Sequence, residues 1–192
     1  MKKFLSLIAL LTMITGGVFA QGISGGLKLG MNLANQTISA EGMTVSPSFR
    51  TSIHAGGYIT AMISEKFGVQ PEILYSGQGA KNGDFSFKAN YISVPVMLRW
   101  NFTSLFSIHA GPQLGILMSA KEEFGGESVD VKDDYKSTDI GVAAGVGIDL
   151  PMGLNFGFRF AKGMSNIVDS DEYKQKNYAL QFSVGYKLFG KK

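Results

Sequence analysis

The sequence predicts an all-β fold, an eight-stranded antiparallel up-and-down transmembrane β-barrel. Three observations support this prediction. Eight segments alternate large apolar residues with small or polar ones, and a period of two residues is typical of a β-strand. One face of these segments carries no charge in any of the eight. Long and short connections alternate, as in a barrel whose successive connections leave from opposite rims.

Residues 1–20 have the layout of a secretory signal peptide. Lys2 and Lys3 precede an apolar run from Phe4 to Met13, and a small, glycine-containing end leads to a predicted cleavage site after Ala20. A membrane-anchor helix is the alternative, and the short apolar core argues against it. Residues 21–192 then form one β-barrel domain, whose net charge falls from +3 to +1 when the two lysines are removed.

The first three strands are predicted over 26–34, 52–63 and 67–77. Their apolar faces hold Leu27, Leu29, Met31, Leu33, Ile53, Ile59, Ile63, Phe67, Val69, Ile73 and Tyr75. Small or polar residues stand opposite, among them Lys28 and Glu72. A long polar segment separates the first two strands, whereas a short turn joins the second to the third.

The next two strands are predicted over 91–100 and 105–117, joined by a tight turn. Their apolar faces hold Ile92, Val94, Val96, Leu98, Trp100, Phe106, Ile108, Leu114 and Ile116. Tyr91 and Arg99 have the opposite, inward parity.

The last three strands are predicted over 139–150, 154–161 and 178–189. Their apolar faces hold Ile140, Val142, Val146, Ile148, Leu154, Phe156, Phe158, Phe160, Tyr178, Leu180, Phe182, Val184, Tyr186 and Leu188. We expect the last strand to pair with the first, because a closed ring leaves no unpaired edge.

Lipid on the apolar face is the favoured interpretation, and a soluble lipocalin-like barrel is the alternative. In a soluble barrel the charged face would meet water and the apolar face would line a ligand cavity. The charged face is rich in glycine and nearly balanced in charge, which suits a narrow interior. The apolar face is too bulky for an eight-stranded interior.

Signal-peptide export assigns the short turns to the periplasm and the long loops to the extracellular side. Aromatic residues near strand ends are expected at the membrane interfaces: Tyr75, Trp100, Phe106, Phe156 and Tyr178. We expect a surface ligand to bind through the four long loops, 35–50, 78–90, 118–138 and 162–177. The acidic stretch within the third loop either bridges lipopolysaccharide through divalent cations or is simply a solvated face.

Seven charged residues share the inward face and form the candidate functional set: Lys28, Glu72, Arg99, Asp139, Asp149, Arg159 and Lys187. Buried charges must be paired, and Glu72 and Arg99 lie on neighbouring strands, as do Asp149 and Arg159. We therefore expect a salt-bridged plug, with a selective ion path as the alternative.

Other kinds of site receive little support. The inward His54 and His109 fall on strands that are not neighbours, and a metal site would need further ligands. Glycines between Gly141 and Gly147 fit an inward strand face better than a phosphate-binding loop, since no helix is predicted to follow. The chain has no cysteine, no basic stripe interleaved with aromatics and no second long apolar run. We expect no catalytic residues, no cofactor, no metal and no nucleic-acid partner.

Several short segments resemble the bacterial outer-membrane β-barrel domain, the porin-family proteins. They are residues 26–33, 91–98, 110–115, 141–147 and 159–163, in the family's order and spacing. The resemblance implies an eight-stranded barrel in the outer membrane of a Gram-negative bacterium, surrounded by outer-membrane lipids and lipopolysaccharide. It also implies a terminal aromatic residue read by the barrel-insertion machinery, whereas here Gly190-Lys191-Lys192 follow Phe189.

The function expected from these observations is non-enzymatic: a structural or surface-interaction role through the extracellular loops. A narrow pore for small solutes or ions is the first alternative. A soluble periplasmic ligand-binding barrel and an outer-membrane enzyme acting on lipids are the others.

Overall fold

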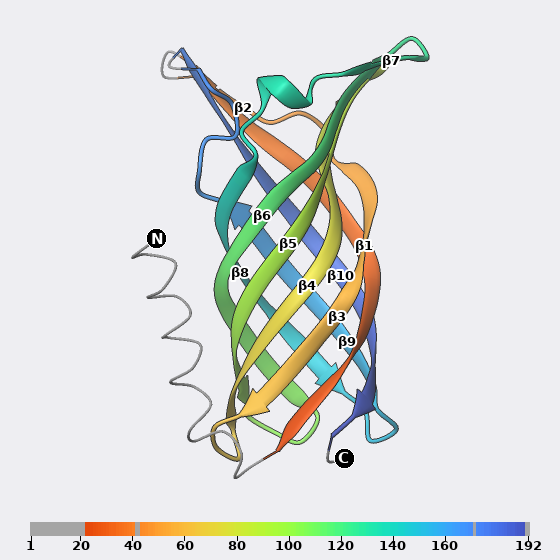
Figure 1. The fold of residues 1–192 in the computed structure, drawn as a ribbon, viewed down its shortest axis with the longest axis vertical. Coiled ribbons are helices and arrows are strands. Elements are labelled where there is room, and N and C mark those ends of the chain that lie inside the picture. Colours follow the sequence, from red (N-terminus) through yellow and green to blue (C-terminus); the bar gives the residue numbers. More distant parts are fainter. Residues whose placement is uncertain (1–21, 41–42, 171, 191–192) are drawn as a thin grey trace.

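The computed structural model describes residues 22–40, 43–170 and 172–190. Eight antiparallel strands pair in a closed ring, as Figure 1 shows. In ring order they are β1 (Ile23–Ala40), β3 (Arg50–Met62), β4 (Phe67–Asn82), β5 (Phe85–Asn101), β6 (Phe106–Phe124), β8 (Thr138–Asp149), β9 (Leu154–Gly163) and β10 (Tyr173–Phe189). The predicted fold class is confirmed. The expected signal peptide, residues 1–20, lies outside the described residues.

The ring closes between the first and last strands, as the sequence predicts. β1 and β10 pair in antiparallel register from Gly25 opposite Phe189 to Ala40 opposite Tyr173. Closure matters because an unpaired strand edge in lipid would leave backbone donors and acceptors without partners. Within the described residues, no helix is long and apolar enough to cross a membrane.

The two ends of the barrel differ in structure. Short connections at 63–66, 102–105 and 150–153 lie at one end, drawn at the bottom of Figure 1, where β1 begins and β10 ends. At the other end, β5 and β6 extend beyond the part of the wall whose outward side chains are apolar. Two short strands, β2 (Met43–Val45) and β7 (Glu127–Asp130), and the 3₁₀ turn η3 (Lys132–Asp134) lie at this extended end.

The prediction that residues 78–90 form a long loop is wrong. Nearly all of it lies in β4 and β5, which pair up to Asn82 opposite Phe85 and are joined by Gly83 and Asp84 alone. Gly83 has a φ of +59°, a left-handed conformation that glycine adopts at no steric cost. The loops predicted at 35–50, 118–138 and 162–177 also begin or end inside strands, so this rim is built largely of β-structure.

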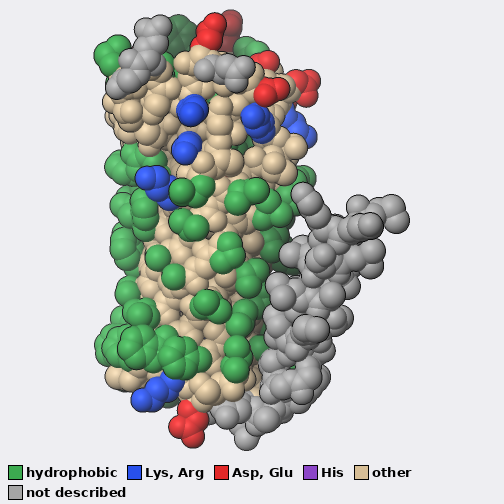
Figure 2. Space-filling model, turned by 90° about the vertical axis from the view of Figure 1, so that its left-hand side faces the viewer, with side chains coloured by type: hydrophobic (Ala, Val, Ile, Leu, Met, Phe, Trp, Pro, Cys, Tyr) green, Lys and Arg blue, Asp and Glu red, His purple; other side chains and the backbone are tan. Residues whose placement is uncertain are grey.

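The two faces of the wall have the predicted polarity in the part that spans the membrane. Outward side chains such as Leu29, Ile73 and Leu98 are about 60% exposed or more, at 60%, 64% and 65%. Inward side chains such as Glu72 and Asn32 are buried. Figure 2 shows hydrophobic side chains spread over the wall, with charged side chains gathered toward its two ends. At the extended end, Asp and Glu lie nearest the rim and Lys and Arg lie below them.

Candidate functional site

A buried carboxylate lies at the centre of the barrel interior. Glu72, on β4, is 1% exposed. Its Oε1 accepts hydrogen bonds from Lys28 Nζ and Arg159 Nη2, each at 2.8 Å, and from Gln70 Nε2 at 2.7 Å. Its Oε2 accepts a bond from Arg159 Nη1 at 3.0 Å. Two cations and an amide thus satisfy one carboxylate, as burial of a charge requires.

The Glu72–Arg159 ion pair crosses the barrel interior. β4 and β9 are separated by β3, β1 and β10 along the ring, so they stand on opposite walls of an eight-stranded barrel. The two-pronged contact therefore joins walls that share no backbone hydrogen bond. A bridge of this kind obstructs the path along the barrel axis.

A second ion pair lies nearer the short-turn end. Arg99 donates from Nη2 to Asp149 Oδ2, from Nε to Asn101 Oδ1 at 2.9 Å and from Nη1 to Gln70 Oε1 at 3.2 Å. Gln70 also donates to Glu72, so this amide links the two ion-pair clusters. We call the connected set Lys28, Gln70, Glu72, Arg99, Asp149 and Arg159 the interior network.

The pairs expected from neighbouring strands, Glu72 with Arg99 and Asp149 with Arg159, are wrong. Arg99 pairs in register with Gly68, four residues before Glu72, and Arg159 with Gly145, four residues before Asp149. Four residues along a strand are about 13 Å, too far for a salt bridge. Glu72 therefore binds Arg159, and Arg99 binds Asp149.

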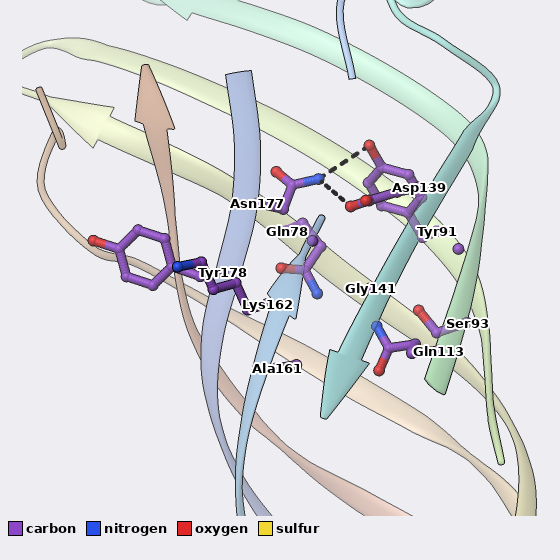
Figure 3. Close-up of a pocket in the computed structure, with 12 residues that line it drawn as sticks. Gln78, Tyr91, Ser93, Gln113, Asp139, Gly141, Ala161, Lys162, Asn177 and Tyr178 are labelled. Atoms are coloured by element: carbon purple, nitrogen blue, oxygen red, sulfur yellow. Dashed lines mark hydrogen bonds between the residues drawn. The ribbon is translucent and has the colours of Figure 1, made fainter. Parts of the chain in front are cut away.

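The other two predicted charges lie outside the interior network. Asp139 is nearer the extended end, where its Oδ2 accepts a hydrogen bond from Asn177 Nδ2 at 2.9 Å and its Oδ1 accepts one from Ser165 Oγ at 2.9 Å. Asn177 also donates to Tyr91 Oη at 3.3 Å (Figure 3). Lys187 lines the mouth at the short-turn end.

The two histidines are interior residues in separate surroundings. His54 Nδ1 lies 2.7 Å from Asn32 Oδ1, and Arg159 Nε lies 3.4 Å from His109 Nε2. A Cβ atom at Gly30 would come within 2.5 Å of the His54 ring, so glycine leaves room for it. In the part of the chain that the structure describes, no group of three or more His, Cys, Asp or Glu residues could hold a metal ion.

Two hollows of the interior are small, whereas a mouth at one end is larger. Spaces of about 30 Å³ beside Arg159 and about 20 Å³ beside Asp139 are each the size of one or two water molecules. A mouth of about 510 Å³ opens at the short-turn end, where Arg99 and Asp149 line it. The interior network lies between this mouth and the extended end.

Uncharged amides complete the interior, and sequence reasoning did not single them out. Asn32 donates to Ser76 Oγ at 3.0 Å and Gly77 O at 2.8 Å, while Gln181 donates to Asn32 Oδ1 at 3.2 Å. The signal available in the sequence was their position on the inward face of the strands, because a buried polar side chain needs hydrogen-bond partners there.

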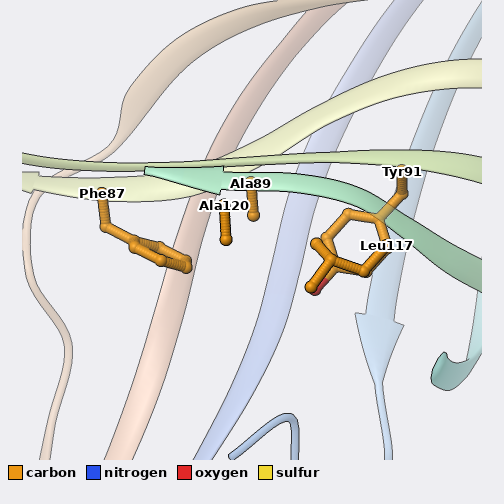
Figure 4. Close-up of a cluster of buried hydrophobic side chains, with 5 residues drawn as sticks. All are labelled: Phe87, Ala89, Tyr91, Leu117 and Ala120. Atoms are coloured by element: carbon orange, nitrogen blue, oxygen red, sulfur yellow. The ribbon is translucent and has the colours of Figure 1, made fainter. Parts of the chain in front are cut away.

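The extended end has a hydrophobic core of its own. Five inward side chains from β5 and β6 are buried together in Figure 4: Phe87, Ala89, Tyr91, Leu117 and Ala120. We call these five the upper core. The ring of Tyr135 stacks on that of Phe87 with centroids 4.6 Å apart, and Val131 also packs against the cluster. The upper core therefore holds the segment after β7 against the barrel.

An acid-lined hollow of about 500 Å³ lies beside this segment, bordered by Glu122, Asp133, Asp134 and Asp169. Lys136 Nζ approaches Asp169 Oδ1 at 3.5 Å. Burial raises the pKa of Tyr135, and the nearby carboxylate of Glu122 raises it further. This hydroxyl is therefore harder to ionise than that of a solvent-exposed tyrosine.

A family model described as outer membrane protein beta-barrel domain matches residues 19–169. The chain belongs to this family. The match covers most of the sequence, and the closed ring with its apolar outer wall agrees with it. The expected resemblance is confirmed, and the barrel is an outer-membrane barrel. No curated protein sequence matches the chain.

Solved outer-membrane barrels share the fold. Ail, the attachment invasion locus protein of Yersinia pestis, is 15% identical, with 88% of this chain and 99% of that chain covered at a TM-score of 0.52. Neisserial surface protein A is 14% identical, with 84% and 97% covered at a TM-score of 0.53. At these identities the similarity shows the fold alone.

Proposed function

We propose that this protein is a closed outer-membrane anchor that presents a structured extracellular surface for binding, and that it catalyses no reaction. The observation that carries the proposal is the Glu72–Arg159 bridge across the interior. The bridge pairs two inward charges with each other across the barrel axis, which argues against a continuous charged path along it. The binding role then falls to the extended end.

The extended end is suited to binding because it is ordered before a partner arrives. The upper core and the β6–β7 hairpin hold its segments in place, so less conformational entropy is lost on binding. Its acid-lined hollow favours a cationic partner. The names of two structural neighbours, an attachment invasion protein and a surface protein, fit such a role.

The proposal also includes the export of the protein and the orientation of the barrel in the membrane. Export by a signal peptide cleaved after Ala20 would deliver the chain to the barrel-insertion machinery of a Gram-negative bacterium. The short turns would then face the periplasm and the extended end the cell exterior.

Conductance of the refolded protein in a planar bilayer tests the proposal. We expect the wild type to be silent. The double variant Glu72→Ser with Arg159→Ser removes the bridge and should produce small steady currents, which shows that the assay detects an opened barrel. Steady conductance of the wild type would contradict the closed anchor.

A narrow pore is the second candidate, and one observation favours it. The 510 Å³ mouth narrows onto Arg99 and Asp149, an arrangement that could select ions. If this candidate is right, wild-type current exists and Arg99→Ala changes its ion selectivity.

A further inference from the structure

An apolar groove of about 650 Å³ runs over the outer wall formed by β8, β9, β10, β1 and β3. Its floor includes Gly157, Ser183 and Gly30, which are register partners in one row across β9, β10 and β1. Its sides are outward apolar side chains: Leu29, Met31, Ile53, Val146, Ile148, Phe156, Phe158, Phe182 and Val184. A groove with such sides on a lipid-facing wall suits an acyl chain.

Three lysines lie on the same wall, closer to the extended end. Lys162 of β9 is the register partner of Tyr178 on β10, and Lys176 and Lys174 follow on the same outward face of β10. Lys162 and Lys176 are thus diagonal neighbours, about 7–8 Å apart. Within the described residues none of the three lysines forms an ion pair. Their charge is available to a ligand.

Hydroxyl groups lie beside the lysines, and aromatic rings lie between the lysines and the groove. Thr37 and Ser39 of β1 are the register partners of Lys176 and Lys174. Below them the rings of Phe160 and Tyr178 lie with centroids 6.4 Å apart, at the level where aromatic residues mark a membrane interface.

The spacing fits within one leaflet of a bilayer. Lys162 is four residues beyond Phe158 on β9 and Lys176 is six residues from Phe182 on β10, about 13 Å and about 20 Å along the strands. With strands tilted by about 40°, these lengths are about 10 Å and about 15 Å along the membrane normal. Half of a hydrocarbon core about 30 Å thick is about 15 Å. An acyl chain in the groove would therefore place its headgroup at the lysines.

We infer that this wall binds one phosphorylated lipid of the outer leaflet, with an acyl chain in the groove and its phosphate held by Lys162, Lys174 and Lys176. The apolar groove selects a lipid, and the unpaired cationic cluster selects an anionic headgroup. The acidic side chains nearest the rim would repel such a headgroup and so favour the position of the lysines. This inference rests on the proposed orientation, with the extended end at the cell exterior, and is independent of whether that end binds a partner.

Lipid binding to the protein in zwitterionic micelles tests the inference, with retained lipid counted by native mass spectrometry. The probe is a bisphosphorylated lipid A, compared with its dephosphorylated form and with inorganic phosphate as competitor. We expect Lys162→Gln, Lys174→Gln and Lys176→Gln combined to weaken retention of lipid A about tenfold to a hundredfold. The charge-matched control is Lys81→Gln, Lys121→Gln and Lys132→Gln combined, which should retain lipid A as the wild type does.

A second variant tests the groove without changing charge. Val184→Phe narrows it and should weaken retention several-fold, whereas Val96→Phe on the lipid face of β5 should not. Equal loss in the two lysine triples would overturn the inference in favour of general charge attraction. Equal retention of the dephosphorylated lipid would overturn the phosphate assignment, and full competition by inorganic phosphate would overturn the lipid assignment. Unchanged retention in Val184→Phe would remove the groove from the site.

Discussion

The strands β5 and β6 have opposite polarity in their lower and upper halves. In the lower half Leu98 faces outward to lipid and Arg99 faces the polar interior. In the upper half the inward residues Phe87 and Ala89 are buried, whereas the outward Lys88 is only partly covered and pairs with Glu123. The same two strands therefore have their apolar face outward in the membrane and inward above it.

This inversion shows that the solvent around a strand decides which face is apolar. Lipid rewards apolar side chains outside, and the narrow interior then receives the polar ones. Above the bilayer water lies outside, so the hydrophobic effect drives apolar side chains inward as in a soluble protein. The lower half depends on paired charges and the upper half on buried apolar area. Substitutions in the two halves should therefore have different consequences.

The largest expected effect is in the interior of the lower half. Glu72→Ala leaves Lys28 and Arg159 buried without their anion and should lower the free energy of unfolding by about 3–5 kcal/mol. Urea unfolding in micelles measures this. Glu123→Ala, which removes the partly exposed partner of Lys88, is the control and should cost less than about 1 kcal/mol. Equal losses would mean that the interior charges are not desolvated.

The next effect concerns the outer wall. Val184→Arg places a charge on the lipid face and should lower stability in the bilayer by about 2–4 kcal/mol if it lies near the midplane. Val129→Arg, an exposed position on β7, should change nothing. The fraction of folded barrel after insertion into vesicles measures both. Normal insertion of Val184→Arg would contradict the assignment of faces.

A smaller effect is expected in the upper core. Phe87→Leu weakens the stacked contact with Tyr135 and should cost about 1 kcal/mol. The loss should appear as faster trypsin cleavage of the extended end while urea unfolding of the barrel is unchanged. Phe124→Leu, at an exposed position, serves as the control. If Phe87→Leu lowers barrel stability as well, the two halves unfold as one unit.

The smallest expected effect involves Tyr135 and appears only at alkaline pH. Because the pKa of Tyr135 is raised in the folded protein, its contribution to stability is present below the unfolded pKa of about 10 and is lost as the pH rises above it. Trypsin protection of the extended end should therefore decrease above about pH 10. Tyr135→Phe should reduce that decrease and leave protection at pH 7 unchanged. Identical pH profiles for the two proteins would contradict a raised pKa of the partly buried Tyr135.

Sequence reasoning missed the upper core for an identifiable reason. The run from Phe85 to Tyr91 keeps the period of two, but its outward residues are polar, so it looks like a loop when lipid is assumed outside. β6 adds a second difficulty. The register shifts between Asn90 opposite Ser119 and Tyr91 opposite Leu117, and this bulge turns Ala120 inward against the parity of the preceding residues.

The sequence by itself determined the strand number, the outward and inward faces and the closure of the ring. Alternation is a local property of the chain, and lipid requires every backbone group to be paired. Only the tertiary structure decided that Glu72 binds Arg159, 87 positions away, and that an apolar groove lies below three lysines. Those contacts depend on strand stagger and on reach across the interior, which join residues that no local pattern relates.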